Sequence, residues 1–150
     1  MAQQPFRHII ILVDGTESSF KAAEYAVQLA RVCKAQLTAV GIVDTETLKH
    51  LLTAGIMVAA EMAEHEHELE SSGRKHLAYV AGLAGEHGVK AHTVLLKGAV
   101  HSAVLAEQKS SGSDLIVIGA FRWTLCHHDQ AARERQLILD EAPCPVLVVR

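Results

Sequence analysis

The sequence predicts an α/β protein, a three-layer α/β/α sandwich built around a doubly wound parallel sheet. Five short apolar stretches alternate along the chain with segments whose apolar residues recur at helical spacing. Each apolar stretch is continuous rather than alternating, which is typical of strands that are buried on both faces of a parallel sheet. Right-handed crossovers through helices join such strands and cover both faces.

The first strand and helix are expected at the N-terminal end. Residues 8–13 (HIIILV) form a β-branched run that stops at a turn of sequence DGT. A helix is expected over residues 19–34, because apolar side chains follow one face and charged or polar ones the other. Thr16 or Ser18 can cap it.

The middle of the chain continues the alternation. Residues 36–43 form a second apolar strand, and residues 44–88 are rich in helix-forming residues. We expect a loop with a helical turn there, then a long helix that ends at Gly88. A third strand over residues 90–96 precedes a helix over residues 99–110.

The C-terminal part holds the clearest strand, residues 114–119. After an irregular stretch, Asp129 can cap a helix that runs to about residue 141. Residues 144–149 form the fifth strand, directly behind Pro143. We expect the whole chain, residues 1–150, to be one domain, because its length suits one core and no linker interrupts it.

The ligand crevice of such a sheet lies beyond the carboxyl ends of its strands, where the strand order reverses. The predicted strands place Asp14, Ile42 and Gly119 on one rim of this crevice. These three residues are therefore the first candidates for ligand contacts.

Composition excludes several classes of partner and site. The formal net charge is −3, with acids and bases mixed along the chain, so we expect no nucleic acid and no membrane as partner. The N-terminus lacks the basic and long apolar regions of a signal peptide, so we expect a cytoplasmic protein. Three separated cysteines without CxxC spacing indicate reduced thiols rather than a disulfide framework or a zinc site.

Four segments carry a resemblance to a known family. They are IIILVDGTESSFKAAEYAVQLA, VLLKGAVHSAVLA, SDLIVIGAFR and LDEAPCPVLVVR. In this order they resemble the universal stress protein family from end to end. The strand DLIVIG and the closing APCPVLVV are the most specific of these signatures.

The resemblance implies a fold of the adenine nucleotide alpha hydrolase-like type, with a five-stranded parallel sheet of order 3-2-1-4-5. It also implies a cytoplasmic homodimer paired through the last strand, in the region of Val146 and Val148. The family is divided between members that bind ATP and members that do not. The binding members carry a Gly-x2-Gly-x9-Gly-Ser/Thr motif after the fourth strand, whose glycines admit phosphates to backbone N–H groups.

This phosphate motif is altered here at three of its four positions. Gly119 is kept, but Arg122 and Ala132 replace the next two glycines and Arg133 replaces the hydroxyl residue. Two outcomes are open. The two arginines fill the space of a triphosphate and abolish binding, or their guanidinium groups form a charge-assisted anion site in place of the backbone cradle.

The other matching positions are intact or nearly so. Asp14 matches the acid of the family's first strand, which lies near the ribose or a metal that bridges the phosphates. The alternative role of Asp14 is a turn residue that caps the next helix. Ile42 matches a position that contacts adenine, although isoleucine is equally expected in a core, and Gly15 completes the candidate set. Leu12 stands where many members have proline.

Further clusters have simpler interpretations. The segment CHHD at residues 126–129 holds metal-competent side chains, but adjacent residues rarely converge on one ion, so we expect no metal site. The EHEHE run at residues 64–68 is interpreted as a solvated helix face. Trp123, in the altered loop, either shields the former phosphate site or anchors a partner, and local packing of the loop on its own domain is the simpler interpretation. Cys144 is expected to pack rather than react, and no nucleophile elbow is present for catalysis.

The functional prediction is a non-enzymatic cytoplasmic stress-response protein that needs no cofactor and acts either through contacts with an unknown regulatory protein partner or by sensing a small ligand. The alternative is a regulator that binds ATP, AMP or a cyclic nucleotide, with slow ATPase activity as its weakest form.

Overall fold

The computed structural model describes residues 4–121 and 130–150. Its strands form one five-stranded parallel sheet of order β3-β2-β1-β4-β5, which confirms the predicted fold class and strand order. The strands are β1 (His8–Leu12), β2 (Gln36–Asp44), β3 (Ala91–Gly98), β4 (Leu115–Gly119) and β5 (Val146–Val149).

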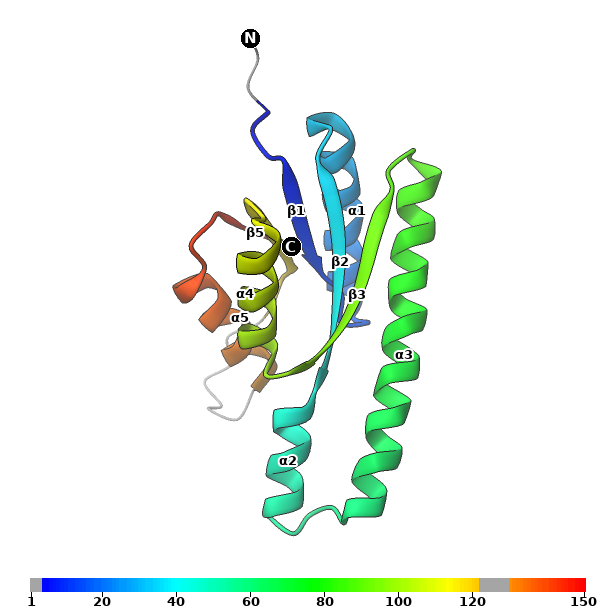
Figure 1. Cartoon of the computed structure of the whole chain (residues 1–150), viewed down its shortest axis with the longest axis vertical. Helices are drawn as coiled ribbons and strands as arrows, with labels where there is room; N and C mark the ends of the chain where they lie inside the picture. The colour runs from blue at the N-terminus through cyan, green and yellow to red at the C-terminus, as the bar shows by residue number, and fades with distance from the viewer. Residues whose placement is uncertain (1–3, 122–129) are drawn as a thin grey trace.

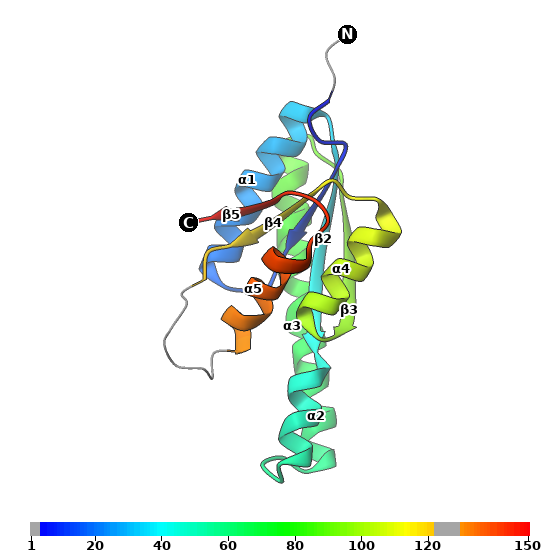
Figure 2. The same ribbon diagram turned by 90° about the vertical axis from the view of Figure 1, so that its left-hand side faces the viewer.

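Helices connect the strands and cover the two faces of the sheet (Figures 1 and 2). They are α1 (Glu17–Cys33), α2 (Thr45–Thr53), α3 (Ala59–Glu86), α4 (Val100–Ser111) and α5 (Gln130–Glu141). Helices α1 and α3 pack on one face, and α4 and α5 pack on the other. No helix in the described part of the chain is long and apolar enough to cross a membrane.

Alternate side chains of the strands supply two aliphatic cores, one under each helical layer. On the first face, Ile9 and Ile11 of β1 pack with alanines of α1 and with Val80 of α3. On the second face, Ile10 of β1 and its neighbours pack with one valine of α4 and with Ile138 of α5. Both sides of β1 are therefore buried, which explains its continuous apolar run.

Helix α1 begins and ends at caps that are visible in the sequence. Thr16 is its N-cap, and its hydroxyl accepts a hydrogen bond from the backbone N–H of Ser19 at 3.2 Å. Lys34 closes the helix in the left-handed conformation, with φ of 54°. The choice between Thr16 and Ser18 is thereby settled in favour of Thr16.

The segment between β2 and β3 differs from the expectation of a loop with one helical turn. Its first part is the nine-residue helix α2, which Asp44 caps by accepting a hydrogen bond from the N–H of Thr47 at 3.0 Å. Helix α3 has 28 residues and its buried side chains, Leu77, Val80 and Ala84, all lie in its second half. The first half projects beyond the sheet beside α2 (Figure 1).

Candidate functional site

The carboxyl ends of β1 and β4 meet at one edge of the sheet and bring together three of the predicted site residues. Asp14 and Gly15 follow β1, and Gly119 is the last residue of β4. Both strand ends lie next to the first turn of α1. The rim that the strand pattern predicts is thus present, and its chemistry depends on the partners of Asp14.

Asp14 forms an ion pair with Arg135 of α5. The Nη2 of Arg135 donates to Oδ2 of Asp14, and the backbone N–H of Thr16 donates to Oδ1 at 3.0 Å. The side chain of Asp14 is 27% exposed and that of Arg135 only 11%. Both carboxylate oxygens therefore already have a donor. The alternative role as a helix cap belongs to Thr16, two residues further on.

Arg135 is held in place by more than the ion pair. Its Nη1 donates to the backbone carbonyl of Ala131 at 3.0 Å, one helical turn earlier. Burial lowers the pKa of the Arg135 guanidinium, because desolvation disfavours its charged form. Arginine stays protonated in proteins even so, and the carboxylate of Asp14 supplies the counter-charge.

Gly15 lies where only glycine fits. Its φ is +81°, in the left-handed region, and a β-carbon there would run into the ring of His76 on α3. The same His76 ring packs edge-on against Phe20, with ring centroids 5.7 Å apart. Gly15 therefore allows the turn after Asp14 to form and allows α3 to pack closely against it.

Gly119 has a structural role at the same rim. A β-carbon on Gly119 would lie 2.7 Å from the backbone carbonyl of Ser18 and 2.8 Å from the backbone nitrogen of Ser19. The strand end and the first turn of α1 are thus in direct backbone contact. This glycine is explained by close packing, whether or not a phosphate binds nearby.

Ile42, the predicted adenine-side residue, lies on β2 and is partly buried. It packs against the core cluster under α4 and α5, beside Leu96 of β3 in the sheet register. It does not line the cavity described next. The interpretation of Ile42 as a core residue therefore fits its contacts.

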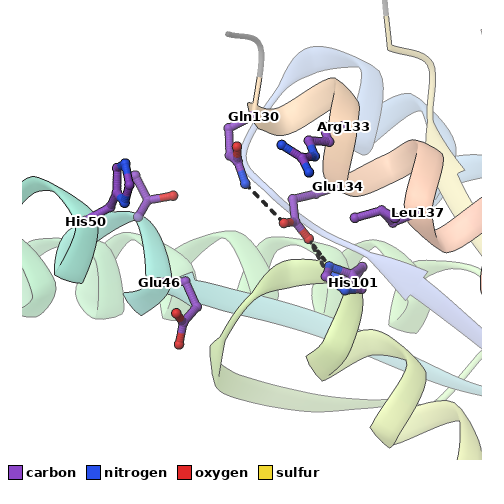
Figure 3. A pocket seen from close by; sticks show the side chains of 8 residues that line it. Glu46, His50, His101, Gln130, Arg133, Glu134 and Leu137 are labelled. Carbon is purple, nitrogen blue, oxygen red and sulfur yellow. Dashed lines mark hydrogen bonds and ion pairs between the residues drawn. The ribbon is translucent and has the colours of Figure 1, made fainter. Parts of the chain in front are cut away.

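A cavity of about 650 Å³ opens between α2, α4 and α5 (Figure 3). Its lining residues are Glu46, Thr47, His50, His101, Gln130, Arg133, Glu134 and Leu137. Arg133, which replaces the motif's hydroxyl residue, is exposed on this cavity and has no hydrogen bond or ion pair within the described ranges. It makes no contact with Asp14, which Arg135 holds instead.

One wall of the cavity contains a buried carboxylate, Glu134, which is 5% exposed. Its Oε2 accepts hydrogen bonds from the backbone N–H of His101, at 2.9 Å, and from the Nδ1 of the same residue. Its Oε1 accepts from the side-chain amide of Gln130 at 3.2 Å. Glu134 thereby caps the first turn of α4 and ties it to α5.

Sequence reasoning missed Arg135, Glu134 and His101. One signal was available: Ala132, Arg135 and Ile138 recur every three residues along α5, and all three are buried. A charged residue in the middle of an apolar helix stripe needs a buried partner. Nothing local to α5 indicates that the partner is Asp14, 121 residues earlier.

Several predictions lie outside the described residues. These are Arg122 as an anion ligand or obstacle, the two roles of Trp123, and the CHHD segment with Asp129 as helix cap. Within residues 4–121 and 130–150, no group of three or more histidine, cysteine or acidic side chains is placed to hold a metal ion.

The remaining clusters fit their structural interpretations. On α3, His65 and Glu68 form an exposed pair 3.8 Å apart, and Glu66 lies 3.3 Å from Lys97 of β3. Burial, with a smaller effect from the charge of Asp114, raises the pKa of the Cys144 thiol. A raised pKa leaves less of the reactive thiolate at neutral pH, as expected of a packing residue.

Comparison with protein families gives one match across the chain. A sequence model described as the universal stress protein family matches residues 5–150. A universal stress protein of Methanocaldococcus jannaschii is 29% identical over 146 residues, which cover 97% of this chain and 82% of that protein.

Solved structures agree on the fold. A protein of the universal stress protein family from Burkholderia pseudomallei superposes with a TM-score of 0.75 at 22% identity and covers 99% of this chain and 98% of its own. A universal stress protein in complex with cAMP superposes at 0.64, with 18% identity and 97% of each chain covered. One from Archaeoglobus fulgidus in complex with dAMP superposes at 0.63, with 12% identity, and covers 99% of this chain and 100% of its own.

Proposed function

Because this chain belongs to the universal stress protein family, we propose that it is a non-enzymatic stress-response protein that works without binding ATP. The observation that carries the proposal is the ion pair between Asp14 and Arg135. In ATP-binding members, the acid at this position lies near the ribose or the bridging metal. Here its two oxygens are taken by Arg135 and Thr16, so that role requires breaking a partly buried ion pair.

The altered motif supports the same conclusion. Ala132 and Arg133 stand where a glycine and a small hydroxyl residue admit phosphates to the backbone. A β-carbon and a long side chain both reduce that close approach.

The proposal also places the protein in the cytoplasm, a reducing compartment that suits the free thiols of Cys33 and Cys144. It assigns the action of the protein to contacts with a regulatory protein.

Isothermal titration with ATP and Mg²⁺ tests the proposal, after native mass spectrometry has checked the purified protein for a bound ligand. We expect no saturable heat with ATP up to about 1 mM, a limit that corresponds to about 4 kcal/mol of binding free energy. The Asp14→Asn variant is expected to behave identically. Saturable ATP binding by the wild type would contradict the proposal, and its loss in Asp14→Asn would assign the binding to the end of β1.

A second candidate function is an adenine-nucleotide-binding regulator. Two observations favour it: Arg133, which lies on the cavity without a partner among the described residues and can bind a phosphate, and the two structural neighbours solved in complex with cAMP and dAMP. Titration with AMP, cAMP and adenosine distinguishes it. Saturable binding of all three would show recognition of the nucleoside and would move this function to first place.

We also propose that the protein forms a homodimer through the open edge of β5. The carbonyl oxygens of Pro145 and Val149 accept hydrogen bonds from Ile116 of β4, at 3.1 Å, and from Ala120 directly after β4, at 2.7 Å. Because successive residues of a strand point their backbone groups to opposite sides, the amides of Val146 and Val148 face the open edge. These are the groups that a second copy can pair with.

The Val148→Pro variant tests this interface. Proline removes one outward N–H and leaves the bonds to β4 in place, so we expect the dimer dissociation constant to rise at least about tenfold. Val148→Thr keeps the N–H and is the control. Sedimentation velocity over a concentration series gives both constants. A Val148→Pro dimer as stable as the control would assign the interface to another surface.

A further inference from the structure

The lining of the cavity between α2, α4 and α5 indicates which class of ligand it suits. Of the eight described residues that line it, seven are polar or charged, and the eighth is Leu137. Its volume of about 650 Å³ lies within the range of small-molecule sites. Purine bases are usually held between apolar or aromatic surfaces, and the described residues that line this cavity offer no such slot.

Arg133 gives the cavity a place for an anion. Its guanidinium is exposed on the cavity and unpaired within the part of the chain that the structure describes. The nearest acid on the same helix, Glu134, is occupied by His101 and Gln130. Arg133 is therefore available for the planar, bidentate contact that guanidinium groups make with phosphate.

The facing walls offer hydrogen-bonding groups for hydroxyls. Glu46 and His50 lie on α2, across the cavity from Arg133 on α5, and His101 of α4 lies beside Glu134 on the α5 side (Figure 3). His101 has its Nδ1 next to the carboxylate of Glu134, which leaves Nε2 as an acceptor. The exposed hydroxyl of Ser102 lies 3.3 Å from Nε2. A ligand hydroxyl can make the same contact.

We propose that this cavity binds a small sugar phosphate, with the phosphate on Arg133 and the hydroxyls between Glu46 and His101. The inference rests on the proposed function, because it assigns another ligand to the cavity of a protein that does not bind ATP. The proposal agrees with the place of Ile42, which packs against the core cluster and does not line the cavity, since a sugar phosphate needs no adenine contact.

Isothermal titration with ribose 5-phosphate as the probe tests the proposal. We expect saturable binding with a dissociation constant of about 1 mM or tighter, and at least tenfold weaker binding by Arg133→Gln, which loses a charged hydrogen bond. Arg31→Gln is the matched control, because Arg31 is an exposed arginine on α1, on the opposite face of the sheet. The control is expected to bind like the wild type.

Three further probes give outcomes that contradict the proposal. If inorganic phosphate binds as tightly as ribose 5-phosphate, the cavity is an anion site that does not recognise the sugar. AMP that binds while ribose 5-phosphate does not would assign the affinity to adenine. If ribose binds as tightly as ribose 5-phosphate, Arg133 does not bind the phosphate. The same conclusion follows if Arg133→Gln binds ribose 5-phosphate with unchanged affinity. Absence of ribose 5-phosphate binding also overturns the proposal, whereas saturable ATP binding overturns the proposed function.

Discussion

Replacing Asp14 with alanine is expected to lower the free energy of unfolding by about 3 kcal/mol, because it leaves the Arg135 guanidinium buried without a counter-charge. The side chain of Arg135 is only 11% exposed, and the carboxylate of Asp14 is its one ion-pair partner among the described residues. The Thr16 contacts at the start of α1 are lost with the same carboxylate. Urea unfolding at pH 7 measures the change.

The two partners are expected to respond unequally. Arg135→Met keeps the length and apolar stem of the side chain, and it leaves Asp14 27% exposed to water and still bonded to Thr16. We therefore expect a loss of only about 1 kcal/mol for this variant. Asp140→Ala on the exposed end of α5 is the control. If Asp14→Ala costs no more than this control, the ion pair does not hold α5 to the strand end.

Replacing Gly119 with alanine is expected to cost about 3 kcal/mol, because the added methyl meets backbone that cannot move aside. The ideal β-carbon position lies 2.7 Å from both the carbonyl carbon and the oxygen of Ser18. To accommodate it, the first turn of α1 must shift away from the end of β4. The same shift would move the Thr16 cap and the turn at Asp14.

Gly82→Ala provides the matched control in the same chain. Gly82 lies within α3, and apart from its chain neighbours and the adjacent backbone of α3, no described atom lies within 4 Å of the position that its β-carbon would take. Alanine there is expected to stabilise the protein by about 0.5–1 kcal/mol, the ordinary gain in helix propensity. Thermal and urea unfolding of the two variants give the comparison. A Gly119→Ala variant as stable as the wild type would show that the strand end and α1 are loosely packed.

Most of the fold was predictable because its signals are local. The strand over residues 8–13 and the helix over residues 19–34 were expected within two residues of β1 and α1. The order of the strands came from the family resemblance, not from the strand patterns. Helix α2 was missed as a helix because it is short and buries only Leu48. Its cap, Asp44 with Thr47, was the available signal.

The candidate site was only partly predictable because its decisive contacts join distant parts of the chain. Asp14 was identified from its strand end, but no partner was predicted for it, and the motif pointed to Arg133 rather than Arg135 on the same helix. Residues two apart on a helix point about 200° from each other. Arg133 therefore opens onto the cavity while Arg135 turns towards β1. The bond between His101 and Glu134, on two different helices, has no counterpart in the local sequence.

The projecting half of α3 implies that stability is unevenly distributed in this molecule. A 28-residue helix is about 42 Å long, whereas the eight residues of β3 span only about 26 Å. Residues 59–72 of α3 include no buried side chain, so the separation of this half from α2 leaves both cores intact. Its amides can then exchange with solvent by local opening, at a free energy below that of global unfolding, while those of β1 and β4 need the whole domain to unfold.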